Sequence, residues 1–285
     1  MKAKKKSEIL LVLLPITLLF CLFEIVPLIS IIILSFMPAG EVGFTLVHFQ
    51  NILSKKLYQQ AIGNSVVISM ASASVGIIVA LFGAKAANES KSKAKTIFMS
   101  ILSMTSNFAG VPLAFAYIIL FGNVGVMVML GKHFGITALS EFNLYSVFGL
   151  GLIYVYFQIP LAILLLTPAF EGIRKEWRES VSLLGGSRAT FWRRVGIPVL
   201  LPSIFGTFSV LYANSMAAYA TAYALLQNNF SLLPIRIAEQ FVGDFVQRKE
   251  FGSALAVIMM LLMVIAIALN HQILKRSGGQ PIHEK

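Results

Sequence analysis

Residues 171–202 read EGIRKEWRESVSLLGGSRATFWRRVGIPVLLP, and this polar stretch decides how the rest of the chain is interpreted. It carries nine charged residues, six basic and three acidic. Apolar stretches flank it on both sides, each with about the 20 residues that a helix needs to cross a bilayer. A polar segment of this length between two spans lies outside the hydrocarbon. We therefore expect it to meet a partner in the aqueous phase.

The composition of the whole chain is that of a membrane protein. Of the 285 residues, 57% are hydrophobic and only 12% are charged, whereas soluble domains carry about 25% charged residues. The net charge of +11 comes from basic residues at the ends of apolar stretches, so we expect a lipid bilayer and no nucleic acid as partner. Cys21 is the single cysteine, which excludes a disulfide within the chain.

Six apolar stretches are long enough to span a bilayer, which predicts an all-α polytopic fold. They cover residues 9–37, 61–84, 97–120, 145–170, 201–226 and 253–273. The first has a basic start, but it is about twice as long as a signal-peptide core, so we expect a retained helix. A shorter apolar piece, 124–130, is expected at the outer interface.

The distribution of basic residues predicts the orientation. With six alternating spans, 17 of the 23 Lys and Arg residues fall on the side of both termini and the polar segment. An excess of Lys and Arg marks the cytoplasmic side. The expected regions are a first helix with its external loop (1–60), a core of five helices (61–274) that contains a cytoplasmic loop (171–200), and a cytoplasmic tail (275–285).

The polar segment also contains a spaced motif. A Glu and two small residues are followed after three residues by Gly, and nine residues later by V-x-I-P. In order, these positions are Glu179, Ser180, Val181, Gly185, Val195, Ile197 and Pro198. The spacing resembles the E-A-A, three residues, G, nine residues, I-x-L-P loop in permease subunits of binding-protein-dependent type I ABC importers. Ser-Val replaces Ala-Ala and Val-x-Ile replaces Ile-x-Leu.

The resemblance covers roughly residues 64–274 and implies a transport subunit of a bacterial inner membrane, not an enzyme. It implies a cytoplasmic ABC ATPase dimer that holds ATP and Mg, a second permease (identical or homologous), and an extracytoplasmic solute-binding protein. This chain itself is expected to bind no cofactor. The segments 107–122 and 218–239 resemble the spermidine/putrescine branch most. Related branches import ferric iron, thiamine, phosphonates or oxyanions.

The residues of the segment predict a helix–Gly–helix elbow without reference to any family. A helix over 177–184 would place Val181 and Leu184 on one face and end at Gly185-Gly186, because glycine accepts a positive φ. Ser187 is a good N-cap for a second short helix. In the importer interpretation Gly185 supplies the turn, Glu179 the polar docking contact and Pro198 the link to the fifth span. The alternative is an amphipathic segment that rests on anionic headgroups.

Polar side chains inside the spans are candidates for the solute pathway. On the fifth span, the residues at i, i+3, i+7 and i+11 of one expected helix face are Tyr212, Ser215, Tyr219 and Tyr223. On the third span, Asn107 is a candidate. Helix packing explains such residues equally well. Glu24 is the one acidic residue in the middle of an expected span, where it serves a cationic solute or pairs with another helix or with a second permease subunit.

Several motifs are absent from the sequence. It has no G-x-x-x-x-G-K-[ST] phosphate loop, so ATP would be bound by a separate subunit. It has no H-E-x-x-H, no G-x-S-x-G and no Cys/His cluster, which argues against a metal site or a membrane-embedded enzyme. A secondary transporter or channel remains the rival class, although it would need repeats or charged midplane sites.

Overall fold

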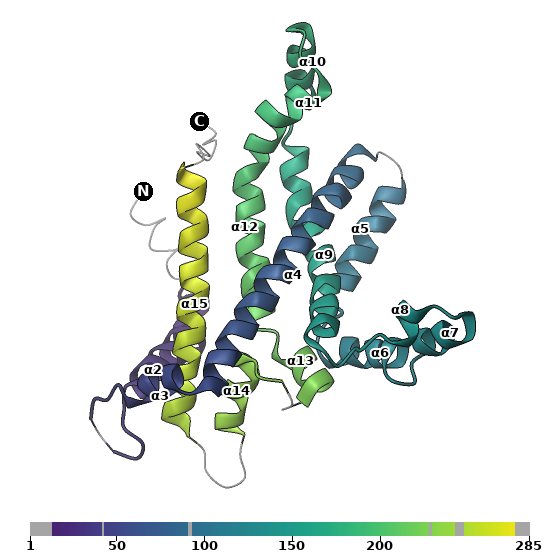
Figure 1. Ribbon diagram of the computed structural model, residues 1–285. Helices are drawn as coiled ribbons and strands as arrows, with labels where there is room; N and C mark the ends of the chain where they lie inside the picture. The colour runs from purple at the N-terminus through teal and green to yellow at the C-terminus, as the bar shows by residue number, and fades with distance from the viewer. Residues whose placement is uncertain (1–12, 42, 91–92, 228–229, 243–247, 277–285) are drawn as a thin grey trace, which may run out of the picture.

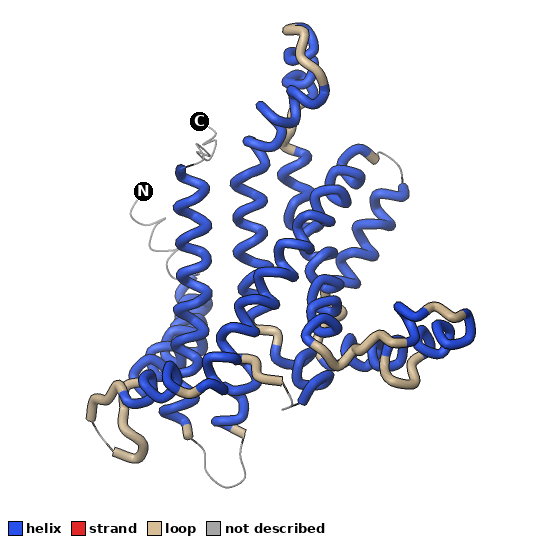
Figure 2. Tube along the Cα trace, in the orientation of Figure 1, coloured by secondary structure: helices blue, strands red, loops and turns tan. Residues whose placement is uncertain are grey.

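The computed structural model describes residues 13–41, 43–90, 93–227, 230–242 and 248–276. These residues form helices and loops without any strand (Figure 2). The basic residues before Leu13 and most of the tail 275–285 lie outside the described residues. In chain order (Figure 1) the elements are η1 (Cys21–Ile25), α2 (Val26–Ser35), α3 (Val47–Ser54), α4 (Lys56–Glu89), α5 (Lys93–Ser106), α6 (Val111–Phe121), α7 (Val126–Phe134), α8 (Thr137–Ser140), α9 (Val147–Glu171), α10 (Lys175–Leu183), α11 (Arg188–Phe191), η2 (Trp192–Gly196), α12 (Ile197–Met216), α13 (Tyr219–Leu226), α14 (Leu233–Phe241) and α15 (Lys249–Arg276).

Three helices, α4, α9 and α12, form the centre of the bundle. They approach closely because α4 presents small side chains: a Cβ on Gly76 would lie only 3.0 Å from the Cβ of Gln158 on α9. Gln158 is fully buried, and its Nε2 donates to the Leu211 carbonyl oxygen of α12 at 2.9 Å. Small residues and interhelical hydrogen bonds are what hold helices together in lipid, where the hydrophobic effect between helices is lost.

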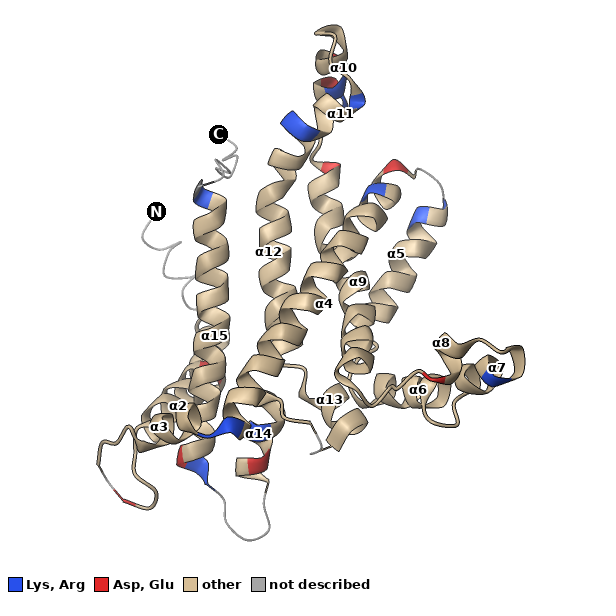
Figure 3. Cartoon of the chain, viewed as in Figure 1, with Lys and Arg blue, Asp and Glu red and all other residues tan. Residues whose placement is uncertain are grey.

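Six stretches of helix are long and apolar enough to cross a membrane, as the sequence predicts. Their bounds are Leu13–Ser35, Lys56–Glu89, Val111–Phe134, Val147–Glu171, Arg188–Met216 and Lys249–Lys275. Within the described residues of the bundle, Lys and Arg gather near its two ends (Figure 3). We call the end that carries α10 and α11 the elbow end, and the opposite end the far end.

The third span differs from its prediction. A continuous helix over 97–120 is wrong, because α5 ends at Ser106 and α6 begins at Val111. Gly110 has φ 77° and ψ −146°, a backbone conformation that is open essentially to glycine alone, and a proline follows in the first turn of α6. In Figure 1, α6 and α7 run across the bundle instead of along it. The piece 124–130 expected at the interface belongs to this transverse arm.

The fifth span differs too. A single helix over 201–226 is wrong, because α12 ends at Met216 and α13 begins at Tyr219. The chain turns at Ala217 and Ala218, where the Tyr219 amide donates to the Ala217 carbonyl oxygen at 2.8 Å. Tyr212 and Ser215 therefore do not share one continuous helix with Tyr219 and Tyr223.

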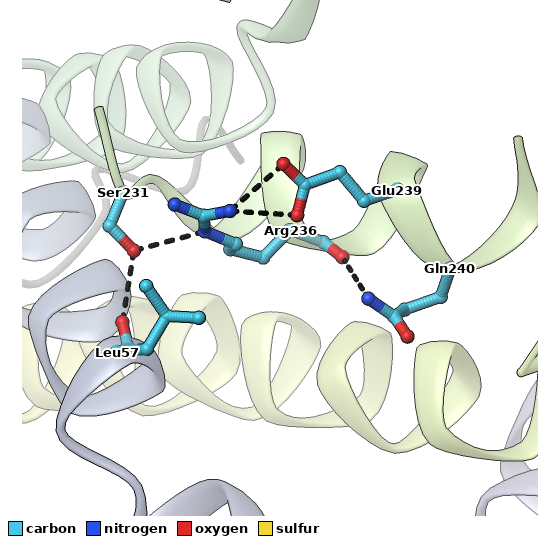
Figure 4. Close-up of polar contacts among 5 residues, drawn as sticks. All are labelled: Leu57, Ser231, Arg236, Glu239 and Gln240. Carbon is cyan, nitrogen blue, oxygen red and sulfur yellow. Dashed lines mark hydrogen bonds and ion pairs between the residues drawn. The ribbon is translucent and has the colours of Figure 1, made fainter. Parts of the chain in front are cut away.

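The segment between α13 and α15 is anchored at the far end by one arginine (Figure 4). Nη1 of Arg236 lies 2.9 Å from both carboxylate oxygens of Glu239, and its Nε donates to Ser231 Oγ at 3.1 Å. Ser231 Oγ in turn donates to the Leu57 carbonyl oxygen at the start of α4, at 2.9 Å. Because the Arg236 side chain is only 13% exposed, the ion pair is better shielded from solvent than a surface pair. The network fixes α14 against α4.

Candidate functional site

The elbow, residues 175–196, is built around a tight helix end. The Gly186 amide donates to the Val181 carbonyl oxygen at 2.8 Å, and the Gly185 amide to that of Ser182 at 3.0 Å. This pair of bonds is a Schellman motif, which satisfies the last carbonyls of α10. Gly185 has φ 75°, so it supplies the left-handed residue that the motif needs. The first helix of the elbow thus ends at the glycine pair, as the sequence predicts.

The second half of the elbow begins with a cap and continues without a break. Ser187 Oγ accepts a hydrogen bond from the Thr190 amide at 3.2 Å, which confirms the predicted N-cap. The following helix does not stop before Pro198, contrary to the prediction: it passes through a wide turn, in which the Ile197 amide bonds the Trp192 carbonyl oxygen, into α12. The wide turn accommodates Pro198, whose nitrogen has no proton to donate to a carbonyl one turn earlier.

The elbow is joined to the bundle through the ends of α4 and α9. Lys85 Nζ lies 5.1 Å from the centre of the Trp192 ring, and Asn88 Nδ2 donates to the Phe170 carbonyl oxygen at 3.2 Å. A groove of about 740 Å³ runs between these helix ends and α10. Its lining includes Lys85, Asn88, Arg174, Arg178, Glu179 and Trp192.

The outer side of the elbow carries exposed apolar residues. Leu183 and Leu184 are 88% and 87% exposed, whereas Val181 is half-buried beside Gly186. Val181 and Leu184 therefore do not share one environment, because Leu184 already lies outside the regular helix. The other predicted contact residues that lie exposed are Glu179, Ser180, Ile197 and Pro198; Val195 is half-buried. Leu183 and Leu184 thus form an exposed apolar pair at the tip of a charged segment.

The two interrupted spans meet at their breaks, and we call this contact the junction. Thr221 Oγ1 of α13 accepts from the Gly110 amide at 3.0 Å and donates to the Gly110 carbonyl oxygen at 3.3 Å. Thr221 is buried. Thr221 was not among the residues predicted from the sequence, although the segment AYATAY contains it as the one threonine between two tyrosines. Discontinuous helices that meet inside a membrane are typical of solute sites in transporters.

Two side chains one turn apart on α9 hold the broken fifth span. Tyr154 Oη donates to the Ala218 carbonyl oxygen at 2.7 Å, next to the break, and Gln158 Nε2 donates to the Leu211 carbonyl oxygen, five residues before α12 ends at Met216. Tyr154 is 2% exposed. These two bonds tie both sides of the break in the fifth span to α9.

The predicted pathway residues fall into two groups. Tyr212 and Ser215 are buried in this chain's own core, where Ser215 Oγ lies 3.0 Å from Ser72 Oγ of α4. The rings of Tyr219 and Tyr223 stack at 5.2 Å between centroids, and Tyr223 is 43% exposed. Asn107 is exposed in the break before α6. The junction therefore connects the breaks that carry Asn107 and Tyr219.

We expect Tyr219→Ala to raise the KM for solute uptake roughly twofold to tenfold, because an aromatic contact contributes about 0.5–1.5 kcal/mol. The matched control is Tyr212→Phe, which keeps a buried ring and should leave the KM unchanged. Uptake into membrane vesicles over a range of solute concentrations measures both. An unaltered KM for Tyr219→Ala would remove this tyrosine from the pathway.

Comparison with known proteins gives consistent matches. The family described as binding-protein-dependent transport system inner membrane component matches residues 74–277, well over half of the chain. The sulfate transport system permease protein CysW of Synechocystis sp. is 23% identical over 261 residues, which cover 87% of this chain and 90% of that protein. The thiamine transport system permease protein ThiP of Escherichia coli is 27% identical over 154 residues, 54% of this chain and 28% of that longer protein.

The fold matches that of a solved importer. A chain of a bacterial ABC transporter involved in the import of the acidic polysaccharide alginate superposes with a TM-score of 0.74 at 16% identity, covering 99% of this chain and 98% of that one. A chain of a bacterial alginate ABC transporter in complex with an alginate pentasaccharide-bound periplasmic protein gives a TM-score of 0.75 at 16% identity, covering 96% of this chain and 96% of that one. At this identity the likeness concerns the fold alone.

Proposed function

Because the chain belongs to the family of binding-protein-dependent transport system inner membrane components, we propose that it is the permease subunit of an ATP-driven importer whose elbow docks on a cytoplasmic ATPase. The observation that carries this proposal is the elbow itself. Its Gly185 turn fixes two short helices, and it exposes two leucines beside Glu179. Motion of such a surface reaches the membrane only if the surface is rigidly connected to a membrane-spanning helix. Here α11 runs unbroken into α12.

The proposed partners are those that membership of this family implies. Two cytoplasmic ABC ATPases bind ATP and Mg and contact the elbows of two permease subunits. The two permeases are identical or homologous. We propose that both termini, like the elbow, belong to the cytoplasmic side, because 17 of the 23 Lys and Arg residues fall on that side of the six spans. An extracytoplasmic solute-binding protein delivers the solute at the far end, where the anchored segment around α14 lies. ATP-driven closure of the ATPases moves the elbow and exposes the pathway to one side at a time.

The class of solute is the finer part of the proposal. Segments 107–122 and 218–239 favour a polyamine, while the relatives' names mention sulfate, thiamine and alginate. Sulfate and thiamine coincide with the oxyanion and thiamine alternatives from the sequence. Uptake of spermidine, sulfate and thiamine into vesicles, each in the presence of the binding protein from the same operon, separates these cases directly.

We expect Glu179→Lys to reduce uptake at least tenfold and to weaken retention of the ATPase during purification. The reversal places a cation where the docking surface presents an exposed carboxylate, and like charges at an interface cost several kcal/mol. The control is Glu141→Lys, which makes the same charge change on an exposed acid at the end of α8. Copurification and vesicle uptake are measured on the same preparations.

The rival class makes the opposite prediction. For a secondary transporter or channel, no ATPase would accompany the intact protein and Glu179→Lys would leave uptake untouched. Observing both results together would overturn the importer proposal.

A further inference from the structure

The groove at the base of the elbow lies where three membrane spans end. Its walls come from the last two turns of α4, the last residues of α9 and the first residues of the span Arg188–Met216. The exposed leucines at the tip, Leu183 and Leu184, are not part of its lining. The groove is therefore at the level of the lipid headgroups, whereas the tip of the elbow lies farther from the bilayer.

The lining carries more positive charge than its own acids neutralise. Two of the four acidic side chains in the groove are paired, Glu171 with Lys95 at 2.9 Å and Glu89 with Arg188 at 3.7 Å. Among the described residues, the other charged side chains of the lining form no ion pair. They comprise two acids, Glu176 and Glu179, and four bases, Lys85, Arg174, Lys175 and Arg178. The groove is thus suited to an anion.

A hydrogen-bond donor in the same groove also lacks an acceptor. Trp192 Nε1 is shielded from solvent and has no hydrogen-bond partner in the described part of the chain. Lys85 Nζ lies 5.1 Å from the centre of the Trp192 ring, and the Arg178 guanidinium lies 5.5 Å from that of Phe191. A buried donor is costly to leave unpaired. The groove therefore combines an unsatisfied donor with two cations held against aromatic rings.

The apolar part of the lining indicates which kind of anion fits. Phe170, Ile173, Phe191 and Trp192 line the groove together with the bases. A free phosphate ion would satisfy the charges but leave these apolar side chains without contact. A phospholipid supplies phosphate and ester oxygens together with the beginning of two acyl chains, so it matches both parts of the lining.

We propose that this groove is a binding site for an anionic phospholipid of the leaflet at the elbow end. Lys85 and Arg178 bind its phosphate, and Trp192 donates to one of its oxygens. Basic pockets between spans on the cytoplasmic side are typical places for anionic headgroups. The bound lipid joins α10 to the ends of α4 and α9, so the elbow is held by lipid as well as by protein. The proposal needs neither a particular solute nor an ATPase.

The two tryptophans of the chain allow a direct test. Trp177→Phe leaves Trp192 as the single fluorescent reporter in the full-length chain, reconstituted into phosphatidylcholine vesicles. Lipids brominated on the acyl chains quench a tryptophan that they contact. We expect brominated phosphatidylglycerol to quench Trp192 at an about fivefold lower mole fraction than brominated phosphatidylcholine, because basic side chains at the bilayer surface favour anionic lipids. Equal quenching by the two lipids would overturn the proposal.

Charge-removing variants locate the preference in the groove. In the same reporter chain, Lys85→Gln combined with Arg178→Gln should abolish the preference for phosphatidylglycerol. The matched control is Arg193→Gln, which removes an exposed charge from η2 outside the lining and should keep the preference. Equal losses in the control and the double variant would mean that overall charge attracts the lipid, and the groove would not be its site. Unchanged quenching by brominated phosphatidylcholine shows that each variant is inserted.

Two other occupants give different results. Millimolar inorganic phosphate should leave the preference intact, and its loss would mean that the groove takes a soluble anion. Native mass spectrometry of the purified importer, incubated with both lipids, should show retained phosphatidylglycerol that the double variant loses. If the isolated chain prefers this lipid but the assembled importer retains none, the ATPase covers the groove and the proposal fails. Failure of the proposed function looks different, because absence of an ATPase leaves the quenching result unchanged.

Discussion

Replacing Gly185 by valine should lower ATP-driven solute uptake at least tenfold. Gly185 has φ 75°, and an added Cβ at this position meets no atom within 4 Å, so the backbone angle alone opposes a side chain. A non-glycine residue held in the left-handed region costs about 1–3 kcal/mol, and more for a β-branched one. The α10 helix end would therefore rearrange, and the elbow would lose its shape.

The matched variant for this test is Gly185→Asn, because asparagine tolerates the left-handed conformation. We expect it to keep most of the wild-type uptake. Both variants are compared by uptake into vesicles and by the amount of ATPase that copurifies. Normal uptake by Gly185→Val would mean that the Schellman end of α10 is unnecessary for transport.

Removing the hydroxyl group of Thr221 should uncouple ATP hydrolysis from uptake. Thr221→Val has nearly the same shape but loses both hydrogen bonds to Gly110. The part-buried Gly110 amide is left unpaired, at about 1–3 kcal/mol, whereas the Gly110 carbonyl oxygen keeps its bond from the Ala114 amide. The breaks in the third and fifth spans would then move independently. We expect roughly tenfold lower uptake, while hydrolysis by the complex continues.

Thr221→Ser keeps the hydroxyl group and should restore uptake. Thr167→Val is the control for loss of a buried threonine hydroxyl, because Thr167 bonds only the Ile163 carbonyl oxygen of its own helix. The ratio of solute taken up to ATP hydrolysed is the decisive measurement. An unchanged ratio in Thr221→Val would mean that the junction is not needed to couple ATP hydrolysis to solute uptake.

The elbow could be predicted in detail because its signals are local. A glycine pair ends a helix and a serine caps the next one through properties of the residues themselves. The exposure of Leu184 differed from expectation, because the cap residue already leaves the helix. Spans were located by composition, since the bilayer acts on every residue in the same way.

The break in the fifth span could not be predicted, because Ala217 and Ala218 are strong helix formers by themselves. Contacts with other elements impose the turn. Tyr154 of α9 bonds the Ala218 carbonyl oxygen, and the backbone of Gly110 bonds Thr221. In the third span, Gly110 and Pro112 are local signals for a bend, and α6 beyond them packs against α13. The spacing of the tyrosines thus predicted a single helix face, whereas the break distributes these residues over α12 and α13.

The continuous helix from Arg188 to Met216 joins the elbow to the break of the fifth span. Its 29 residues extend about 43 Å at 1.5 Å per residue. If this helix tilts as a rigid body by about 10° around its midpoint, its two ends move by about 4 Å in opposite directions. A small rotation imposed at one surface of the membrane thereby displaces the helix end at the opposite surface by about the size of an atom. The length of the helix does not change.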